Sequence, residues 1–187
     1  MRTVLMPLAE GFEELEAVTV IDLLRRAGVE VVTAGLQPGR QALPVTASRG
    51  VVMVPDTALD AVLGDDFDMI VLPGGLPGAH HLRDDERVQA ILKRHAAAGA
   101  YTAAICAAPV ALAQAGLLAG KRATSYPGCI EKLAIADFRH STEAVVVDGK
   151  IVTSRGPGTA MDFALTLIEL LCGRAQRDQV ETGLVRA

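Results

Sequence analysis

The chain has 187 residues, of which 50% are hydrophobic, 21% charged and 3% aromatic, with a formal net charge of −4. The aliphatic content excludes a disordered chain and favours one compact domain over residues 1–187. The acidic balance and the scarcity of aromatic rings argue against constitutive nucleic-acid binding, which needs basic patches or stacking platforms.

Apolar runs rich in β-branched residues alternate along the chain with segments of helical periodicity. The pattern predicts strands at 3–8, 29–34, 51–54, 67–72 and 101–105, and a hairpin at 145–152 with Asp148-Gly149 as its turn. It predicts helices at 13–27, 84–98, 107–115, 159–171 and 174–182, the first of them closed by Gly28. Strands that are apolar on both faces and separated by helices indicate an α/β fold with a mainly parallel sheet covered on both sides.

Membrane insertion and secretion are not expected. The first residues lack the long apolar core of a secretory signal. The uncharged stretch 96–120 is long enough to span a bilayer, but it is rich in alanine and interrupted by Gly99, Pro109 and Gly116. We therefore interpret it as a buried strand and helix. An odd number of cysteines, three, indicates reduced thiols and a cytoplasmic location.

The first predicted helix carries a carboxyl on its apolar face. Glu16 falls on the stripe formed by Ala17, Val20, Leu24 and Ala27. Two interpretations are open: a first-turn glutamate favoured by the helix dipole, or a partly buried carboxyl that keeps its proton because burial disfavours charge. Leu15 and Val18, on the otherwise polar side, indicate a second contact surface, such as a subunit interface.

The segment around Cys106 is the most informative for chemistry. An apolar strand runs into this cysteine, small residues (Ala107 and Ala108) follow, and a helix begins at once. Small neighbours are what the sharp turn of a nucleophile elbow needs. A thiol at a helix N-terminus is expected to favour the thiolate. Cys106 is therefore the candidate nucleophile.

Other polar residues carry weaker signals. Cys172 ends an apolar run and is predicted to lie in the core, whereas Cys129 lies in a turn with no role indicated. His80 and His81 are interpreted as the solvated start of a helix, with an approach to a pocket as the alternative. The chain has no Cys-x-x-Cys or His-Glu-x-x-His spacing, so no metal site is expected.

Two glycine-rich turns follow predicted strands. The turn at 73–78 ends a strong strand, and its glycines Gly74 and Gly75 let backbone N–H groups point at a ligand, as in an oxyanion hole. The turn at 154–159 opens a helix, where an anion site and a simple helix start are equally compatible with the pattern. Both turns are expected at the carboxyl edge of the sheet, where ligands of such folds bind.

Six motifs occur in order along the chain: Glu-Glu-Leu-Glu at 13–16, Arg-Arg-Ala-Gly at 25–28, Ser-Arg at 48–49, Val-Leu-Pro-Gly-Gly at 71–75, Ala-Ile-Cys-Ala-Ala-Pro at 104–109 and Thr-Ser-Arg-Gly-Pro-Gly-Thr at 153–159. In these motifs, and over nearly its whole length, the chain closely resembles the ThiJ/PfpI superfamily, in the branch of the parkinsonism-associated deglycase. The resemblance implies a flavodoxin-like, doubly wound α/β/α sandwich and a homodimer.

The resemblance also implies roles for individual residues. Cys106 matches the family's nucleophile and Glu16 the protonated carboxyl beside it. The resemblance implies substrate contacts at four residues of the glycine turn and the pocket rim: Gly74, Gly75, Ala107 and Tyr126. Of these, Gly75 and Ala107 are implied to be the backbone oxyanion donors. Arg26 and Arg49 match residues near the dimer interface.

Two departures from the family's motifs limit which properties of the family we expect in this chain. Protease-like relatives have a histidine directly after the cysteine, where this chain has Ala107, so peptidase activity is not expected. Many members of the closer branch have a histidine at the pocket rim, where this chain has Tyr126. A phenol cannot act as a base near neutral pH, which puts any mechanism that needs the imidazole in doubt.

Two hypotheses of function follow. The first is a cofactor-independent enzyme that converts 2-oxoaldehydes such as methylglyoxal to 2-hydroxy acids, or removes early glycation adducts from proteins, with Cys106 as nucleophile and Glu16 as proton shuttle. The second is an oxidative-stress sensor and chaperone, in which Cys106 is oxidised to a sulfinate held by Gly75, Ala107 and protonated Glu16.

Overall fold

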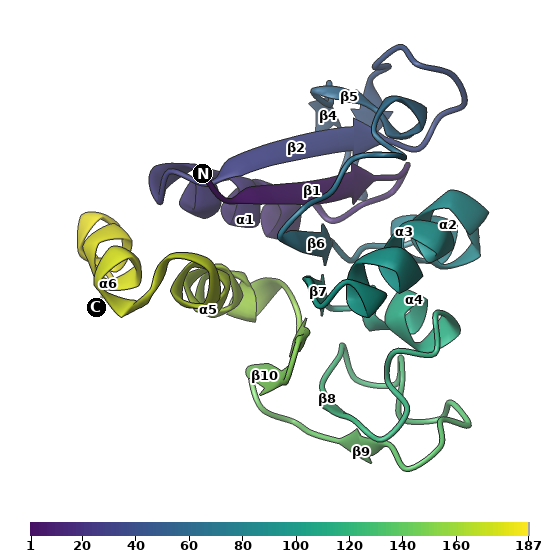
Figure 1. Ribbon diagram of the computed structural model, residues 1–187, viewed down its shortest axis with the longest axis vertical. Helices are drawn as coiled ribbons and strands as arrows, with labels where there is room; N and C mark the ends of the chain where they lie inside the picture. Colours follow the sequence, from purple (N-terminus) through teal and green to yellow (C-terminus); the bar gives the residue numbers. More distant parts are fainter. Residues whose placement is uncertain (187) are drawn as a thin grey trace.

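The computed structural model describes residues 1–186 and is built around a seven-stranded sheet (Figure 1). The strand order is β10-β11-β7-β6-β1-β2-β5, and every neighbouring pair is parallel except the β10–β11 hairpin. The strands are β1 (Thr3–Leu8), β2 (Glu30–Gly35), β5 (Thr57–Ala58), β6 (Met69–Leu72), β7 (Tyr101–Ile105), β10 (Val145–Asp148) and β11 (Ile151–Ser154). This confirms the predicted mainly parallel sheet.

Helices cover both faces of the sheet. One face carries α1 (Glu14–Arg26) and α5 (Ala160–Cys172), which pack against each other, and the opposite face carries α2 (Gly78–Asp84), α3 (Glu86–Ala97) and α4 (Pro109–Gln114) (Figure 1). The arrangement is the predicted flavodoxin-like α/β sandwich. Gly28 ends the α1 segment with φ +76°, and Gly149 turns the β10–β11 hairpin with φ +63°, as the sequence predicts.

The topology has a switch point between β1 and β6. After β1 the chain passes to α1 on one face, whereas after β6 it passes to α2 and α3 on the other. Parallel sheets bind ligands at such a switch point, beyond the carboxyl ends of the strands. Segments distant in sequence, those after β1, β6 and β7, therefore meet at one edge of the sheet.

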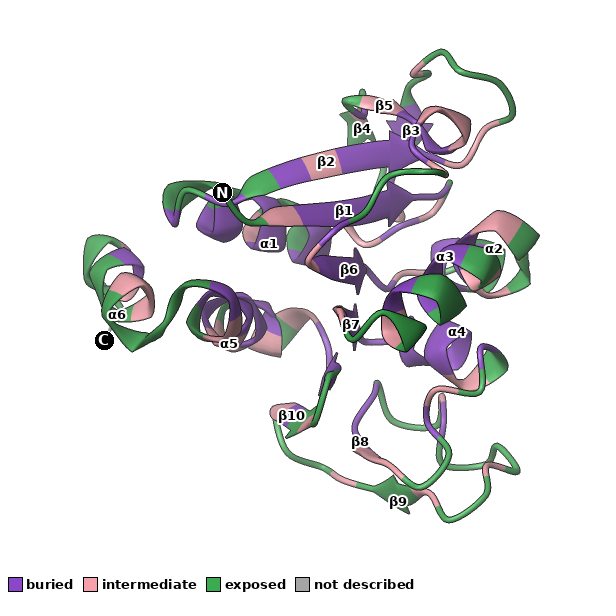
Figure 2. Cartoon of the chain, in the orientation of Figure 1, coloured by how far each residue is buried: buried purple, intermediate pink, exposed green. Residues whose placement is uncertain are grey.

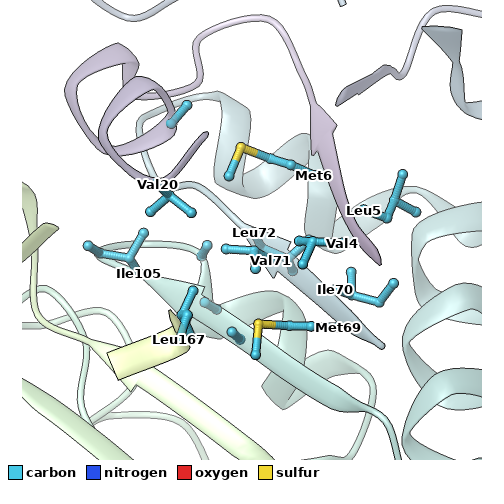
Figure 3. Close-up of a cluster of buried hydrophobic side chains, with 14 of the residues drawn as sticks. Val4, Leu5, Met6, Val20, Met69, Ile70, Val71, Leu72, Ile105 and Leu167 are labelled. Atoms are coloured by element: carbon cyan, nitrogen blue, oxygen red, sulfur yellow. The ribbon is translucent and has the colours of Figure 1, made fainter. Parts of the chain in front are cut away.

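The core is aliphatic and continuous through the sheet. Figure 2 shows the central strands of the main sheet buried and the outer faces of the helices and the long loops exposed. Its centre, drawn in Figure 3, joins three strands to the helices of one face through side chains that are fully buried: Val4, Leu5, Met6, Val20, Met69, Ile70, Val71, Leu72, Ile105 and Leu167. Such close packing makes the strand ends a rigid frame for a site.

The structure corrects two predicted elements. The helix predicted at 84–98 begins at Glu86 instead, because the Asp85 side chain accepts the N–H groups of Arg87 (2.9 Å) and Val88 (3.3 Å) as an N-cap. The preceding α2 is a separate helix. The strand predicted at 51–54 is only β4 (Val52–Met53), which pairs with β3 (Val45–Thr46) outside the main sheet.

Several short elements were not predicted. They are β3, the edge strand β5 of the main sheet, two 3₁₀ turns and a further two-stranded sheet: η1 (Leu59–Ala61), η2 (Pro157–Thr159), and β8 (Arg122–Ala123) paired with β9 (Arg139–His140). Segments of two or three residues carry too little periodicity to be distinguished from loops.

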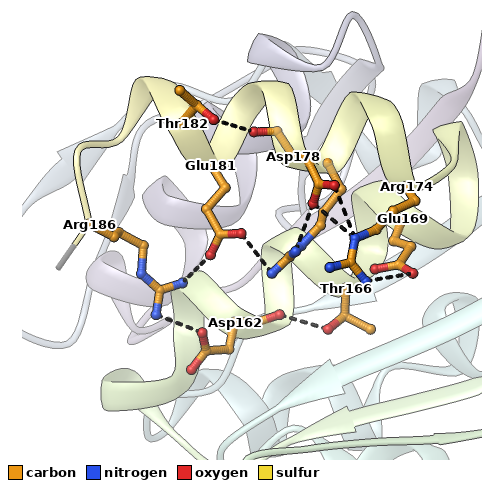
Figure 4. A network of polar contacts seen from close by, with 9 residues as sticks. Asp162, Thr166, Glu169, Arg174, Asp178, Glu181, Thr182 and Arg186 are labelled. Atoms are coloured by element: carbon orange, nitrogen blue, oxygen red, sulfur yellow. Dashed lines mark hydrogen bonds and ion pairs between the residues drawn. The ribbon is translucent and has the colours of Figure 1, made fainter.

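The last helix, α6 (Arg174–Gly183), docks on α5. Figure 4 shows ion pairs that reach from the C-terminal segment to α5, Arg174–Glu169 at 3.9 Å and Arg186–Asp162 at 2.8 Å. Exposed pairs of this kind contribute little individually, so Val180, the buried apolar residue of α6, is the more important anchor.

The position of Cys172 differs from the prediction. This cysteine is exposed at the last position of α5, whereas Leu171 before it is buried. One step along a helix rotates the side chain by about 100°, which carries Cys172 off the buried stripe. The uncharged stretch 96–120 divides between the end of α3, β7 and α4. None of the helices within residues 1–186 combines the length and the apolar character that a bilayer crossing needs.

Candidate active site

Cys106 occupies a strained turn between β7 and α4. Its backbone has φ +62°, a left-handed conformation that is costly for a residue with a Cβ atom. Two hydrogen bonds hold it there: its N–H donates to the Ser154 carbonyl (3.0 Å), and its carbonyl accepts the Tyr126 N–H (2.8 Å). The predicted elbow is therefore present, with strain confined to the residue that carries the thiol.

Glu16 lies in the first turn of α1 and is fully buried. Its Oε2 accepts the Gly74 N–H at 2.8 Å, whereas its Oε1, also buried, has no hydrogen-bond partner among the described residues. Of the two interpretations left open by the sequence, the structure supports the buried carboxyl. A buried oxygen without a partner is costly, so its presence calls for an explanation, of which a catalytic role is one.

The glycines after β6 bring these side chains together. Leu72 pairs with Ala104 in the sheet, so two residues further on Gly74 lies beside Cys106. A Cβ atom on Gly74 would lie 2.6 Å from Cys106 Cβ and 2.7 Å from Glu16 Oε2, so only glycine fits. Gly75 has φ +85°, and a Cβ there would lie 2.4 Å from the Glu13 nitrogen. Both glycines are thus required by close backbone approach.

The two glycine N–H groups have different targets. The Gly74 N–H is used by Glu16, so it supports the carboxyl rather than a substrate. The N–H groups of Gly75 and Ala107 interact with the Cys106 sulfur and lower the pKa of the thiol. These two groups are therefore the ones placed to stabilise negative charge at, or bound to, the sulfur.

The acid–base state of the site is governed by burial. Burial raises the pKa of Glu16 from 4.5 to about 7, against the opposing effects of its hydrogen bonds with Gly74 and Cys106. Burial, together with the charge of Glu16, raises the pKa of the Cys106 thiol to about 12. The prediction of a thiol pKa lowered by the helix terminus is therefore wrong, because desolvation and the neighbouring carboxylate outweigh the N–H groups. The part of that rise due to charge disappears when Glu16 holds the proton.

Tyr126 lies at the rim of the site. Its side chain is 52% exposed, and its ring packs on Gly156, where an added Cβ would lie 3.5 Å from Tyr126 Cδ2. The second glycine-rich turn thus supports this ring. Ser154, whose carbonyl holds Cys106, is itself fixed by a 2.7 Å hydrogen bond to Thr159. The sequence predicts a glycine-rich turn here but not its role in positioning the cysteine, because that role depends on the pairing of β11 with β7.

The two arginines lie apart. Arg49 follows Ser48, which donates to Glu13 at 2.7 Å, and the Arg49 N–H donates to Glu14 at 2.9 Å, so this loop adjoins the start of α1. Arg26 lies at the other end of α1, ten residues or about 15 Å from Glu16, and pairs with Asp22 at 2.7 Å. Within one chain Arg26 is therefore not brought into the site.

His80 and His81 are exposed near the start of α2, which confirms their interpretation as the solvated start of a helix. His80 lines a cavity that also contains Ala107 and Cys129, while His81 lines another near the ends of β1 and β2. Cys129 is half-buried and free. No cluster of three or more His, Cys, Asp or Glu side chains suited to a metal ion occurs within residues 1–186.

A flavodoxin-like sheet with a strained cysteine at the end of β7 and a buried glutamate beside it defines a class of α/β proteins built on a nucleophile elbow. Residues 2–170 match the model of the DJ-1/PfpI family, and the chain belongs to that family. The resemblance seen in the sequence motifs is thereby confirmed.

Individual relatives agree with this assignment. The chain is 42% identical to Protein dj-1beta of Drosophila melanogaster, over 100% of this chain and 98% of the relative. It is 45% identical to Protein DJ-1 homolog A of Arabidopsis thaliana, over 98% of this chain but only 46% of that longer protein, so it spans about half of the latter's length. A solved structure titled Toxoplasma gondii DJ-1, oxidized, superposes with a TM-score of 0.93 at 44% identity, covering 100% of both chains.

One relative has a name that states an activity. The Glutathione-independent glyoxalase DJR-1.2 of Caenorhabditis elegans is 35% identical over 91% of this chain and 88% of its own length. The family to which this chain belongs therefore includes an enzyme that acts on small carbonyl compounds.

Proposed function

We propose that the protein is a cofactor-independent cysteine enzyme that detoxifies reactive carbonyls, as a glutathione-independent glyoxalase and protein deglycase. The observation that carries the proposal is the pairing of Cys106 with a fully buried glutamate whose Oε1 has no partner. A pKa of about 7 lets this carboxyl both accept and return a proton at neutral pH. The name of the nematode relative supports the choice of substrate.

The first step forms a carbon–sulfur bond. Glu16 takes the thiol proton, and the Cys106 sulfur attacks the aldehyde carbon of methylglyoxal. The aldehyde oxygen becomes an oxyanion within reach of the Gly75 and Ala107 N–H groups, then takes a proton to give a hemithioacetal. Because Glu16 has surrendered that proton, its carboxylate is ready to act as a base.

The second stage moves a proton between the two carbons. Glu16 removes the proton from the carbon bound to sulfur and returns it to the neighbouring carbon through an enediol. The hydroxyl proton on the first carbon passes to the oxygen of the second, so that the first carbon becomes the carbonyl of a thioester of the 2-hydroxy acid. Water then breaks the carbon–sulfur bond, lactate leaves and the thiol is restored. The net reaction adds one water to methylglyoxal and needs neither glutathione nor a redox cofactor. An early glycation adduct, the hemiaminal of methylglyoxal with a protein amine, enters the same sequence once its C–N bond breaks. The amine leaves with the hydroxyl proton of the hemiaminal, and the aldehyde carbon so restored is attacked by the Cys106 sulfur.

The test is conversion of methylglyoxal to lactate without glutathione, measured for the intact protein beside Cys106→Ser and Glu16→Gln. We expect turnover to fall by at least about a thousandfold in Cys106→Ser and about a hundredfold in Glu16→Gln. Cys172→Ser is the matched control, because it removes an exposed thiol outside the site and should leave turnover unchanged. Full turnover in Cys106→Ser would contradict the mechanism.

A second function, as an oxidation sensor with chaperone activity, is supported by the same N–H groups. A sulfinate on Cys106 would accept hydrogen bonds from Gly75, Ala107 and protonated Glu16. Titration with hydrogen peroxide, followed by intact mass and peptide mapping, tests it. We expect two oxygens to be added at Cys106 before the more exposed Cys172 reacts. Oxidation in order of exposure alone would exclude this role.

We also propose that the protein acts as a homodimer through α1 and the β3–β4 hairpin. The Val51 N–H contacts Glu14, so the hairpin lies beside the start of α1. The two elements together expose five apolar side chains: Leu15, Val18, Val51, Val52 and Val54. Arg49 borders this surface. Burying it against a second copy would remove a contiguous apolar patch from water. Val18→Glu should yield monomers in sedimentation velocity experiments, whereas Val147→Glu, an exposed valine on β10, should not.

The proposed location is the cytoplasm. Cys106, Cys129 and Cys172 are all free thiols, which suits a reducing compartment.

A further inference from the structure

A cavity of about 560 Å³ adjoins the nucleophile on the side of the sheet covered by α2 and α4. It lies between these helices and the segment 128–135. Ala107, the residue after Cys106, forms part of its wall, so the cavity begins next to an N–H group that interacts with the sulfur. The proposed reaction needs only Cys106, Glu16 and two N–H groups, and it leaves this space unexplained.

Three segments contribute apolar side chains to the cavity: Leu76, Val110, Ala113, Leu133, Ala134 and Ile135. Leu76 is 56% exposed and Leu133 is 42% exposed, so both offer apolar surface to a ligand in the cavity. Alanines at 107, 113 and 134 keep it open where larger side chains would fill it. A volume of this size accommodates far more than the methyl group of methylglyoxal.

The polar groups of the lining favour an uncharged ligand. Arg83 lines the cavity, but its guanidinium donates twice to Asp84, at 2.6 and 2.8 Å, so its charge is already paired. Gln114 is a neutral amide on the exposed side of α4, and His80 is exposed on α2. An anionic chain would lose its hydration without gaining an unpaired guanidinium.

We propose that this cavity binds the uncharged apolar chain of the substrate, so that the enzyme prefers 2-oxoaldehydes with chains longer than the methyl group of methylglyoxal. The inference rests on the proposed function and specifies its substrate class. With the aldehyde carbon at the Cys106 sulfur and its oxygen at the Ala107 N–H, the rest of the molecule passes along Ala107 into the cavity. Each buried methylene should raise kcat/KM by up to about fourfold.

The experiment compares methylglyoxal with 2-oxohexanal, which has three more methylenes, by kcat/KM without glutathione. For the intact protein we expect a preference of at least about tenfold for 2-oxohexanal. Ala134→Phe and Ala113→Leu fill the cavity from the loop and from α4, and they should abolish the preference while leaving kcat/KM for methylglyoxal within about twofold. Ala97→Phe, at an exposed alanine of α3 outside the cavity lining, should retain it.

The outcomes separate this inference from the proposed function. Equal kcat/KM for the two aldehydes, or a preference that survives both cavity-filling variants, would overturn the assignment of the cavity. Turnover of methylglyoxal would in that case still support the proposed function. If neither aldehyde is converted, the proposed function fails. Binding of 2-octanone, an unreactive ketone, then tests the cavity directly: NMR shifts at Ala113 and Ala134 support an apolar ligand site, and their absence overturns it.

Discussion

The two ends of the sheet carry cavities of similar size whose buried ionisable neighbours differ in how they are hydrogen-bonded. At the amino end of the strands a cavity of about 530 Å³ is lined by Arg2, Asp68, His95, Tyr101 and Lys150 among others, and it matches in volume the one beside Cys106. Both ends contain a buried ionisable side chain: His95 at the amino end and Glu16 at the carboxyl end.

The difference lies in how the polar atoms are satisfied. His95 Nε2 accepts the Phe67 N–H (3.1 Å), so its Nδ1 carries the proton and donates to the Ile91 carbonyl (2.9 Å). Arg2 pairs with Asp68 at 2.6 Å, and the Lys150 ammonium lies 3.7 Å from the centre of the Tyr101 ring. Glu16 has instead one oxygen without a partner, beside a cysteine in a strained turn. Burial alone therefore does not identify a candidate reactive group. At Glu16 it coincides with an unpaired carboxyl oxygen, a raised pKa and a neighbouring thiol in a strained turn.

The largest expected effect concerns the pH dependence of stability through Glu16. Its pKa in the folded state is raised from 4.5 to about 7, so the folded protein binds a proton that the unfolded chain has released. The stability that this group contributes is present below pH 4.5 and is lost as the pH rises to about 7. The loss in the free energy of unfolding is about 3 kcal/mol, since each pKa unit corresponds to about 1.4 kcal/mol. Glu16→Gln, measured by urea unfolding from pH 4.5 to 8, should remove this loss.

Glutamine is a suitable replacement because its carbonyl oxygen can still accept the Gly74 N–H. His95→Gln is the matched control at the other end of the sheet and should leave the loss between pH 4.5 and 7 unchanged. An identical pH profile for Glu16→Gln and the intact protein would show that Glu16 does not retain its proton.

The next effect is steric. Gly74→Ala would place a Cβ within 2.7 Å of both Cys106 Cβ and Glu16 Oε2, which forces apart the nucleophile and the carboxyl. We expect kcat/KM for methylglyoxal to fall about a hundredfold, since a displacement of about 1 Å in a reacting group has that cost. Gly64→Ala is the control, because nothing lies within 4 Å of an added Cβ there. Equal activity in the two variants would refute the close packing of the site.

A smaller effect is expected from the satisfied histidine. His95→Leu leaves the buried Phe67 N–H without its acceptor, so unfolding by urea should show a loss of about 1–3 kcal/mol. The turnover of methylglyoxal at saturating substrate should stay within about twofold, because His95 lies at the opposite end of the strands from Cys106. A selective loss of turnover would make the amino-end cavity a second functional site.

The smallest effect belongs to the cation above Tyr101. Lys150→Met keeps the aliphatic stem but removes the charge, and we expect a loss of about 0.5 kcal/mol in the free energy of unfolding. Lys93→Met, on the exposed side of α3, should cost less. The measurement is the midpoint of thermal unfolding of both variants at low ionic strength, and we expect the lower midpoint for Lys150→Met. Equal midpoints would show that the cation–π contact contributes nothing to stability.

Local patterns in the sequence account for much of the fold. The predicted strands at 3–8 and 101–105 coincide with β1 and β7, because runs of apolar residues with turn residues at both ends leave little choice of boundary. The elbow at Cys106 was also predictable, since small residues between a strand and a helix permit such a turn. Where one polar side chain overrides periodicity, as Asp85 does by capping α3, prediction from the pattern failed.

The sequence by itself therefore determined the alternation of strands and helices, the elbow and the candidate residues Cys106 and Glu16, because each depends on near neighbours in the chain. Only the tertiary structure decided that these two residues, 90 positions apart, meet beside Gly74. It also decided that the thiol pKa rises rather than falls, and that Cys172 faces solvent. Desolvation and exposure depend on every segment that packs around a group, and these segments come together only in the folded chain.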